Sequence, residues 1–157
     1  MATSGARLIS EDAVEALKAR LLPLADVVTP NMPEAEVLCG FAVNDDASME
    51  RAADELAERV RGAALVKGGH GVERADDVLV SAADAPAFWL RAPRIDTENT
   101  HGTGCTLSSA IACGLAQGLP MEAAVRAAKD YVHGALASGL DLGRGNGPLD
   151  HMWERCD

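Results

Sequence analysis

The sequence has few aromatic residues, because Phe, Trp and Tyr together make up only 3% of its 157 residues. Smaller apolar side chains must therefore fill the interior. Hydrophobic residues account for 48% of the chain, which is enough to bury a core and excludes wholesale disorder. The length suits one compact domain rather than two.

Basic residues are also scarce. The chain has 14 Lys and Arg against 24 Asp and Glu, which gives a net charge of -10. Phosphate backbones and anionic membranes attract basic surfaces, so we expect neither nucleic acid nor a membrane as a partner. A small phosphate ligand is not excluded, since it needs only one local pocket of N–H groups and a lysine.

Cysteine pairs at metal-binding spacing are missing, and we expect no signal peptide in residues 1–10. No C-x-x-C pair occurs among the four cysteines, which argues against a zinc site or a disulfide framework. Free thiols in a reducing cytoplasm are the simplest interpretation. Residues 1–10 lack the apolar stretch of a signal peptide. The uncharged segment 99–121 is too rich in Gly, Ser and Thr for a membrane helix.

Helical patterns alternate with short apolar runs along the chain. Strands are predicted at 26–29, 63–67, 78–81 and 88–91, and helices at about 10–22, 34–39, 48–62, 102–118 and from 120 onward. Ser48 is the expected N-cap of the third helix. This order predicts a layered α/β domain in which at least part of the sheet is parallel.

Residues 99–106 contain a glycine turn, Gly102-Thr103-Gly104, at the entry of the helix expected at 102–118. The backbone N–H groups of Gly102, Thr103 and Gly104, together with the helix dipole, favour an anion hole for a phosphate or a developing negative charge. Cys105 falls in the first helical turn, where the pKa of a thiol is lowered, so it is a candidate base or nucleophile. The alternative is a tight packing turn with a small buried cysteine.

Residues beside this turn and after two strands extend the candidate set. Thr100 and His101 directly precede Gly102 and are candidates for contact with a phosphate-bearing cofactor, although a loop histidine is often merely solvated. Lys67 ends a strand before Gly68-Gly69-His70, where it would neutralise a polyphosphate or simply be solvated.

Asn31 and Glu34 stand three residues apart at a helix start, after another strand. They would support a hydrated Mg²⁺ beside a triphosphate; taken alone, ordinary capping by Asn31 with a dipole-favoured Glu34 is the simpler interpretation. Taken jointly, the candidates form the set that phosphoryl transfer needs: metal support, a cation, backbone donors and a proton acceptor. No Walker A motif is present, because the chain has no Gly-Lys-Ser or Gly-Lys-Thr run.

Three further features have simpler interpretations. Cys113 lies on the same helix as Cys105 and is expected to be a core thiol. Asp76-Asp77 precedes a strand and is expected to form a solvated turn. Phe88-Trp89 is expected in the core.

Segments 29–36, 67–70 and 96–110 together resemble the hydroxymethylpyrimidine/phosphomethylpyrimidine kinases of thiamine synthesis, which belong to the ribokinase-like superfamily. The resemblance runs in order through almost the whole chain and includes residues 142–148. Its most specific part is the glycine motif that ends in Cys105, because ribokinase and the usual pyridoxal kinases are similar there but have Asp at that position.

The resemblance implies a ribokinase-like three-layer α/β/α fold with a partly parallel central sheet. Residues 1–157 would be the C-terminal, ATP-side part of such a kinase domain, truncated at the N-terminal side. The implied reaction is ATP-dependent phosphorylation of hydroxymethylpyrimidine and then of its monophosphate, with Mg²⁺. A fragment of this kind would pair with another copy of itself or with the missing N-terminal half.

The resemblance also implies a role for each matching residue. Cys105 would deprotonate the substrate, and the backbone from Gly102 to Cys105 would form the anion hole. Asn31 and Glu34 would support Mg²⁺ and phosphate, and Lys67 would face the ATP phosphates. The alternatives are a pyridoxal-type kinase, a nucleotide-binding fragment without activity and, last, a thiol hydrolase or transferase, for which no histidine has a clear orienting role.

Overall fold

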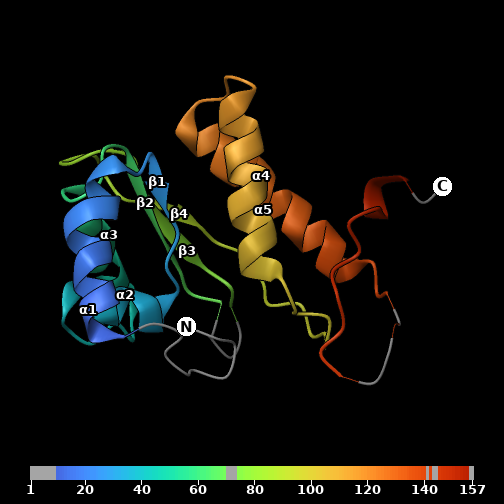
Figure 1. Ribbon diagram of the computed structural model, residues 1–157. Coiled ribbons are helices and arrows are strands. Elements are labelled where there is room, and N and C mark those ends of the chain that lie inside the picture. The colour runs from blue at the N-terminus through green and yellow to red at the C-terminus, as the bar shows by residue number, and fades with distance from the viewer. Residues whose placement is uncertain (1–9, 70–73, 141, 143–144, 156–157) are drawn as a thin grey trace. The chain divides into compact units, whose positions relative to one another are not determined.

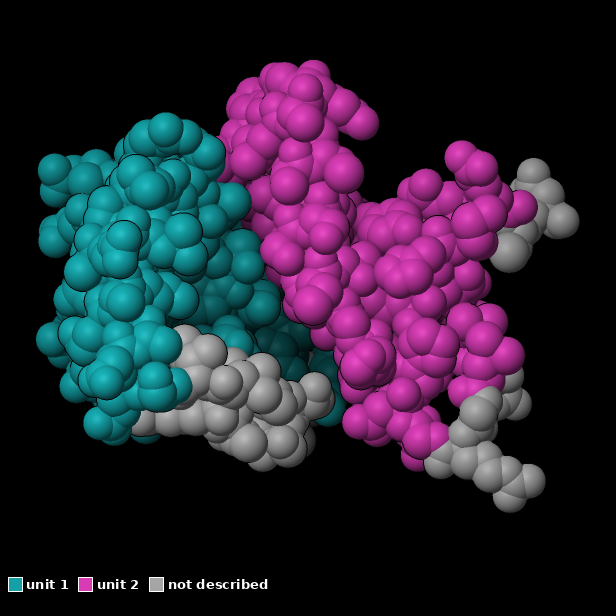
Figure 2. All heavy atoms as spheres, viewed as in Figure 1, with its two compact units in different colours: residues 1–94 teal, residues 95–157 magenta. Residues whose placement is uncertain are grey.

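The computed structural model describes residues 10–69, 74–140, 142 and 145–155. The chain divides into two compact units, residues 1–94 and 95–157, which Figure 2 shows in different colours.

The first unit contains a sheet of four strands in the order β1-β2-β3-β4 (Figure 1). The strands are β1 (Val27–Val28), β2 (Ala63–Lys67), β3 (Asp77–Val80) and β4 (Phe88–Leu90). β1 runs parallel to β2, whereas β2, β3 and β4 pair antiparallel. The sheet is therefore mixed, and the predicted α/β class with a partly parallel sheet is confirmed.

Helices α1 (Glu11–Ala16), α2 (Met32–Cys39) and α3 (Asp46–Ala57) lie on one side of this sheet in Figure 1. After α1 the chain continues through a π-helical segment, η1 (Leu17–Leu21), and a 3₁₀ turn, η2 (Leu22–Leu24), that contains Pro23. Small apolar side chains of α3 fill the core against alternate residues of the strands, including Ala52, Ala53, Leu56, Ala64, Val66, Val78 and Val80. The alternation arises because successive strand residues point to opposite faces.

The start of α3 differs from the prediction. The N-cap is Asp45, not Ser48: the Asp45 side chain accepts a hydrogen bond from the Ser48 backbone N–H at 2.8 Å. The Ser48 hydroxyl in turn accepts from the Asp45 backbone N–H at 3.0 Å. Ser48 is thus the N3 partner in a reciprocal capping box. Asp is as good an N-cap as Ser, and the helix begins at the earlier residue because a second acceptor stands three positions later.

The second unit pairs α4 (Thr103–Ala116) with α5 (Met121–Ala137), followed by a 3₁₀ turn, η3 (Trp153–Arg155). Gly114 allows the two helices to approach closely, since a Cβ there would lie 3.0 Å from the Cβ of Ala124. The buried residues of the two helices are Leu107, Ile111, Gly114, Ala124, Val125, Ala128 and Ala135. Within the described part of the chain, no helix combines the length and apolar character needed to cross a membrane.

Candidate functional site

The turn after β1 is fixed by a capping box at the start of α2. The Asn31 side chain accepts a hydrogen bond from the Glu34 backbone N–H at 2.8 Å, and Glu34 Oε2 accepts from the Asn31 backbone N–H at 2.9 Å. Both side chains therefore do what the capping interpretation predicted. Binding of a metal ion or phosphate by the same two residues would be an additional role. It is compatible with this geometry, because both residues lie at a helix N-terminus.

Lys67 lies beside this turn because β1 and β2 are parallel. The Lys67 backbone N–H donates to the Pro30 carbonyl at 2.9 Å, and Asn31 and Lys67 form a parallel bridge. The carboxyl ends of both strands thus meet at one edge of the sheet, where α/β proteins bind ligands. The structure brings together three of the predicted residues, Asn31, Glu34 and Lys67.

Charge at this edge favours an ionised carboxylate. Burial raises the pKa of Glu34, but the hydrogen bond from the Asn31 backbone and the nearby charge of Lys67 act against it, and the pKa lies below its ordinary value of 4.5. Glu34 is therefore an anion at neutral pH. A single carboxylate with water and phosphate oxygens is the type of donor set that Mg²⁺ takes in kinases.

The two carboxylates expected in a solvated turn before the third strand are in fact buried. Asp76 and Asp77 are each 7% exposed. Asp77 accepts a hydrogen bond from the Gly68 backbone N–H at 3.1 Å, and Asp76 accepts from the Ala92 N–H at 3.0 Å and from the Arg91 guanidinium at 2.8 Å. They hold the turn after Lys67 and the end of β4.

The signal for these carboxylates was present in the sequence. Asp77 begins an apolar strand, where a charged residue is unusual unless an oppositely charged or hydrogen-bonding group pairs with it. Candidate cations are near in the sequence, since Arg74 lies shortly before β3 and Arg91 directly follows β4. Arg74 Nε lies 2.9 Å from Asp76 Oδ2.

The second group of predicted residues lies at the start of α4. Gly102 is the N-cap with φ +88°, a left-handed conformation that disfavours any residue with a Cβ. Its carbonyl accepts from the Thr106 N–H at 2.8 Å, and Thr103 N–H reaches the Thr100 carbonyl at 3.4 Å. Among the described residues, no side chain caps this helix.

The arrangement leaves the first turn of α4 suited to an anion. Within the described part of the chain, the backbone N–H groups of Gly104 and Cys105 have no acceptor, as expected for the first turn of a helix without a side-chain cap. Cys105 is exposed, so the alternative of a small buried cysteine is wrong. A thiol at this position stands where the helix dipole favours negative charge.

The remaining predicted residues lie nearby or outside the described residues. Thr100 and His101 are exposed, and the His101 backbone N–H donates to the Gly147 carbonyl at 3.2 Å. His70, in the predicted glycine turn after Lys67, lies outside the described residues. The structure thus places Asn31, Glu34 and Lys67 in the first unit and residues 100–105 in the second.

Two other expectations need correction. Cys113 is exposed on α4 and is not a core thiol. Phe88 and Trp89 are only half-buried: the Trp89 ring packs against the core, and its Nε1 donates to Glu50 at 3.2 Å. Both errors arise because a helix or strand that is apolar on average still exposes one of its faces.

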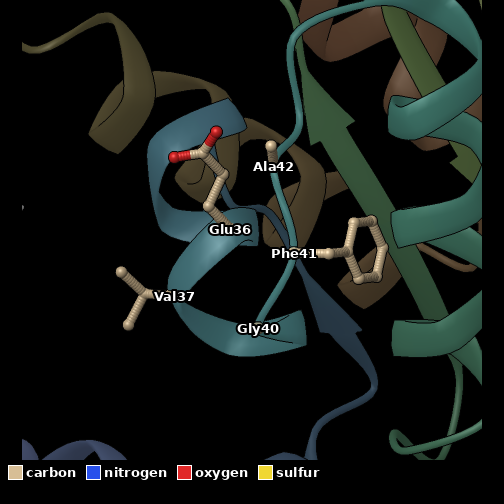
Figure 3. A pocket seen from close by; sticks show the side chains of 5 residues that line it. All are labelled: Glu36, Val37, Gly40, Phe41 and Ala42. Carbon is tan, nitrogen blue, oxygen red and sulfur yellow. The ribbon is translucent and has the colours of Figure 1, made fainter.

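A shallow hollow lies at the C-terminal end of α2, lined by Glu36, Val37, Gly40, Phe41 and Ala42 (Figure 3). Figure 3 shows the Phe41 ring and the Val37 side chain pointing in opposite directions. The Arg51 guanidinium stacks 4.0 Å above the Phe41 ring, and Glu36 accepts from the Val43 backbone N–H at 2.9 Å. None of the predicted site residues lines this hollow. Nor do the described residues contain a group of three or more His, Cys, Asp or Glu side chains placed to hold a metal ion.

Comparison with known proteins gives a consistent result. The family model described as phosphomethylpyrimidine kinase matches residues 1–150. A hydroxymethylpyrimidine/phosphomethylpyrimidine kinase of Streptomyces coelicolor is 48% identical over 149 residues, which cover 95% of this chain and 55% of that protein. The chain spans little more than half the length of this relative and of the corresponding kinases of Haemophilus influenzae and Rhizobium meliloti.

Solved structures show the same fold. The ADP complex of Bacillus subtilis pyridoxal kinase has a TM-score of 0.86 and 33% identity to this chain. The match covers 96% of this chain and 58% of the pyridoxal kinase chain. A phosphomethylpyrimidine kinase from Clostridium difficile 630 has a TM-score of 0.70 and 33% identity to this chain. That match covers 85% of this chain and 52% of the Clostridium kinase chain. The fold is thus the ribokinase-like α/β fold of these kinases.

Proposed function

This chain belongs to the phosphomethylpyrimidine kinase family, and we propose that it provides the ATP-side part of an enzyme that phosphorylates hydroxymethylpyrimidine and its monophosphate. The observation that carries the proposal is the start of α4: a left-handed glycine cap, open backbone donors in the first turn and an exposed thiol at Cys105. The kinases that this sequence resembles are named for that reaction.

In the proposed reaction, the substrate hydroxyl oxygen attacks the γ-phosphorus of ATP, and the bond from that phosphorus to the bridging oxygen of ADP breaks. The Cys105 thiolate accepts the hydroxyl proton. The backbone N–H groups from Gly102 to Cys105 stabilise the negative charge on the transferred group. These donors need no reorganisation, because the helix already fixes them.

The other residues would bind the nucleotide. Lys67 faces the ATP phosphates, and Thr100 and His101 contact the same cofactor. Glu34, with Asn31 beside it, would hold a hydrated Mg²⁺, whose chemistry is to neutralise charge on the phosphate oxygens. The ionised state of Glu34 and its place beside Lys67 support this assignment. We place the protein in the cytoplasm, consistent with the free thiols of Cys39, Cys105 and Cys113 among the described residues.

A second candidate function is the phosphorylation of pyridoxal. The observation that favours it is the TM-score of the Bacillus subtilis pyridoxal kinase, which is higher than that of the pyrimidine kinase from Clostridium difficile. The curated relatives favour the pyrimidine, since their identities to this chain reach 48%. A nucleotide-binding module without turnover is the third possibility, because the chain covers little more than half of its relatives.

One experiment separates these possibilities. ADP release by this chain is measured with ATP, Mg²⁺ and, in turn, hydroxymethylpyrimidine, its monophosphate and pyridoxal, and ATP binding is measured by calorimetry. Faster turnover of the pyrimidines supports the proposal, and faster turnover of pyridoxal replaces it with the second candidate. ATP binding without ADP release assigns the chain as a nucleotide-binding module, and the absence of both overturns all three.

A further inference from the structure

A strap is defined here as residues 140 and 145–155; it contacts the residues before α4 at Leu140 and Gly147, and α5 at its C-terminal end. Leu140 lies just after α5, and the Gly147 carbonyl accepts from the His101 backbone N–H at 3.2 Å. His101 and Pro148 also form a parallel bridge. The strap therefore contacts the residue that immediately precedes the N-cap Gly102.

The Asn99 side chain interlocks with this strap. Its Nδ2 donates to the Leu140 carbonyl. Its Oδ1 packs so closely on Gly147 that a Cβ there would overlap the oxygen and would lie 2.9 Å from the Asn99 Cγ. Gly147 is buried and has no left-handed φ, so close approach to Asn99, rather than backbone conformation, explains the glycine.

The far end of the strap is anchored on α5. Leu149 is 3% exposed, and the Tyr131 hydroxyl donates to the His151 carbonyl at 2.9 Å. The Trp153 ring fills the space above Gly134, where a Cβ would overlap the indole. Because His151 and Trp153 are held on α5, residues 147 and 148 just before them support the segment from Asn99 to His101.

We propose that the interlock between Asn99 and Gly147 holds the entry to α4 in the conformation that the anion site needs, and that Asn99 is a positioning residue for phosphoryl transfer. The catalytic part of this inference rests on the proposed function. The structural part does not, because it concerns only contacts within residues 95–157. Asn99 touches neither Cys105 nor the first-turn donors in the described contacts; it acts through the backbone of His101 and Gly102.

The two parts are tested with Asn99→Ala, Gly147→Ala, their double variant and Gly145→Ala. Gly145 is the matched control, since it lies two residues away, has no left-handed φ, and a Cβ added to it would meet no atom within 4 Å. The first readout is amide hydrogen exchange at His101 and Thr106, whose N–H groups bond to Gly147 and Gly102. The amides of Val125 and Ala128 on α5 report global opening. The second readout is the steady-state rate of ADP release.

We expect Gly147→Ala to speed exchange at His101 about tenfold or more, with the α5 amides and the Gly145→Ala variant unchanged. Asn99→Ala removes the overlap, so Gly147→Ala should add little in that background; this non-additivity is the signature of direct contact. In the same variants kcat should fall while the KM for the pyrimidine stays within about twofold, as expected when transition-state donors are displaced.

Unchanged exchange at His101 in Gly147→Ala, or an equal effect of Gly145→Ala, would overturn the interlock. Faster exchange with an unaltered kcat would overturn the positioning role and leave a structural one. If no variant and not even the unmodified chain releases ADP, the proposed function and the positioning role fail together, while the exchange data still decide the interlock.

Discussion

The backbone N–H of Gly68 donates to the Asp77 carboxylate at 3.1 Å and to the Asp76 carbonyl at 2.9 Å. This pairing ties the residue after Lys67 to the start of β3. On its other side Lys67 pairs with the turn after β1, so its backbone is held between two fixed segments. The backbone of Lys67, which we propose to face the ATP phosphates, thereby has a defined position.

Substituting Gly68 by Ala should destabilise the protein. A Cβ at this position would overlap the Asp76 carbonyl and stand 2.9 Å from Met49 Cε, so the buried turn must shift. We expect a loss of about 1–3 kcal/mol in the free energy of unfolding, the usual effect of overpacking. The matched control is Gly69→Ala, because Gly69 is exposed with nothing within 4 Å of its Cβ position. Equal urea midpoints for the two variants would contradict the close approach.

Asp76 should make stability depend on acid pH. Burial raises its pKa, but the hydrogen bonds from Arg91 and Ala92 and the charge of Arg74 lower it below the ordinary value of 3.8. A carboxylate with a lowered folded-state pKa stabilises the fold above its unfolded-state pKa. That contribution is lost as pH falls through the folded-state value.

The test compares Asp76→Asn with Asp46→Asn in urea unfolding from pH 7 down to pH 3. Both carboxylates pair with Arg91, but Asp76 is buried and Asp46 is 63% exposed. Asp76→Asn should cost about 1–3 kcal/mol at pH 7, with the difference from the unmodified chain shrinking below about pH 4. Asp46→Asn should cost about 0–1 kcal/mol. A difference for Asp76→Asn that stays constant with pH would show that its ionisation is not linked to folding.

The helix and strand pattern was largely predictable, and particular residues show why. The stripe of Met49, Ala52, Ala53 and Leu56 has the helical spacing, and each of these residues is buried in α3. The strand at 63–67 was predicted with the bounds that the structure shows. Apolar periodicity carries this information because it reflects burial directly.

The polar residues were less predictable, because a polar side chain finds its partner through the fold. Asp77 and Gly68 are nine residues apart in the sequence and come close together only once β2 and β3 pair. Asn99 reaches Leu140 across 41 positions. The expectation that Cys113 lies in the core failed for a related reason: the exposed side of α4 is also apolar, so composition alone does not reveal which side is buried.

Asn31 has two candidate roles that substitution can separate. Ser is as good an N-cap as Asn, whereas Ala removes the cap at a cost of about 0.5–2 kcal/mol. We expect Asn31→Ser to keep the stability of the unmodified chain but to weaken ATP binding in the presence of Mg²⁺. Asn31→Ala should lose both stability and binding. Calorimetric ATP affinity and thermal unfolding measure the two effects; unaltered affinity in Asn31→Ser would leave capping as the role of Asn31.

The chain should associate, either with itself or with the remaining part of a longer relative. Within the described residues β1 pairs only with β2, so one edge of the sheet is open. Leu21 and Leu24, shortly before β1, are 59% and 67% exposed. We expect light scattering to give a mass of at least two copies, or of a complex when an N-terminal segment of a relative is added. A monomer that unfolds cooperatively under both conditions would contradict this prediction.

The role of Cys105 is tested most directly by comparing ADP release from Cys105→Ala and Cys113→Ala under saturating ATP, Mg²⁺ and hydroxymethylpyrimidine phosphate. Both cysteines are exposed on α4, so the second variant controls for the loss of a thiol from that helix. If Cys105 is the base at the glycine turn, its removal should lower kcat about 100-fold or more, while Cys113→Ala retains the rate of the unmodified chain. Equal rates in the two variants, or no ADP release by the unmodified chain, would contradict the assignment of Cys105 as the catalytic base in this chain.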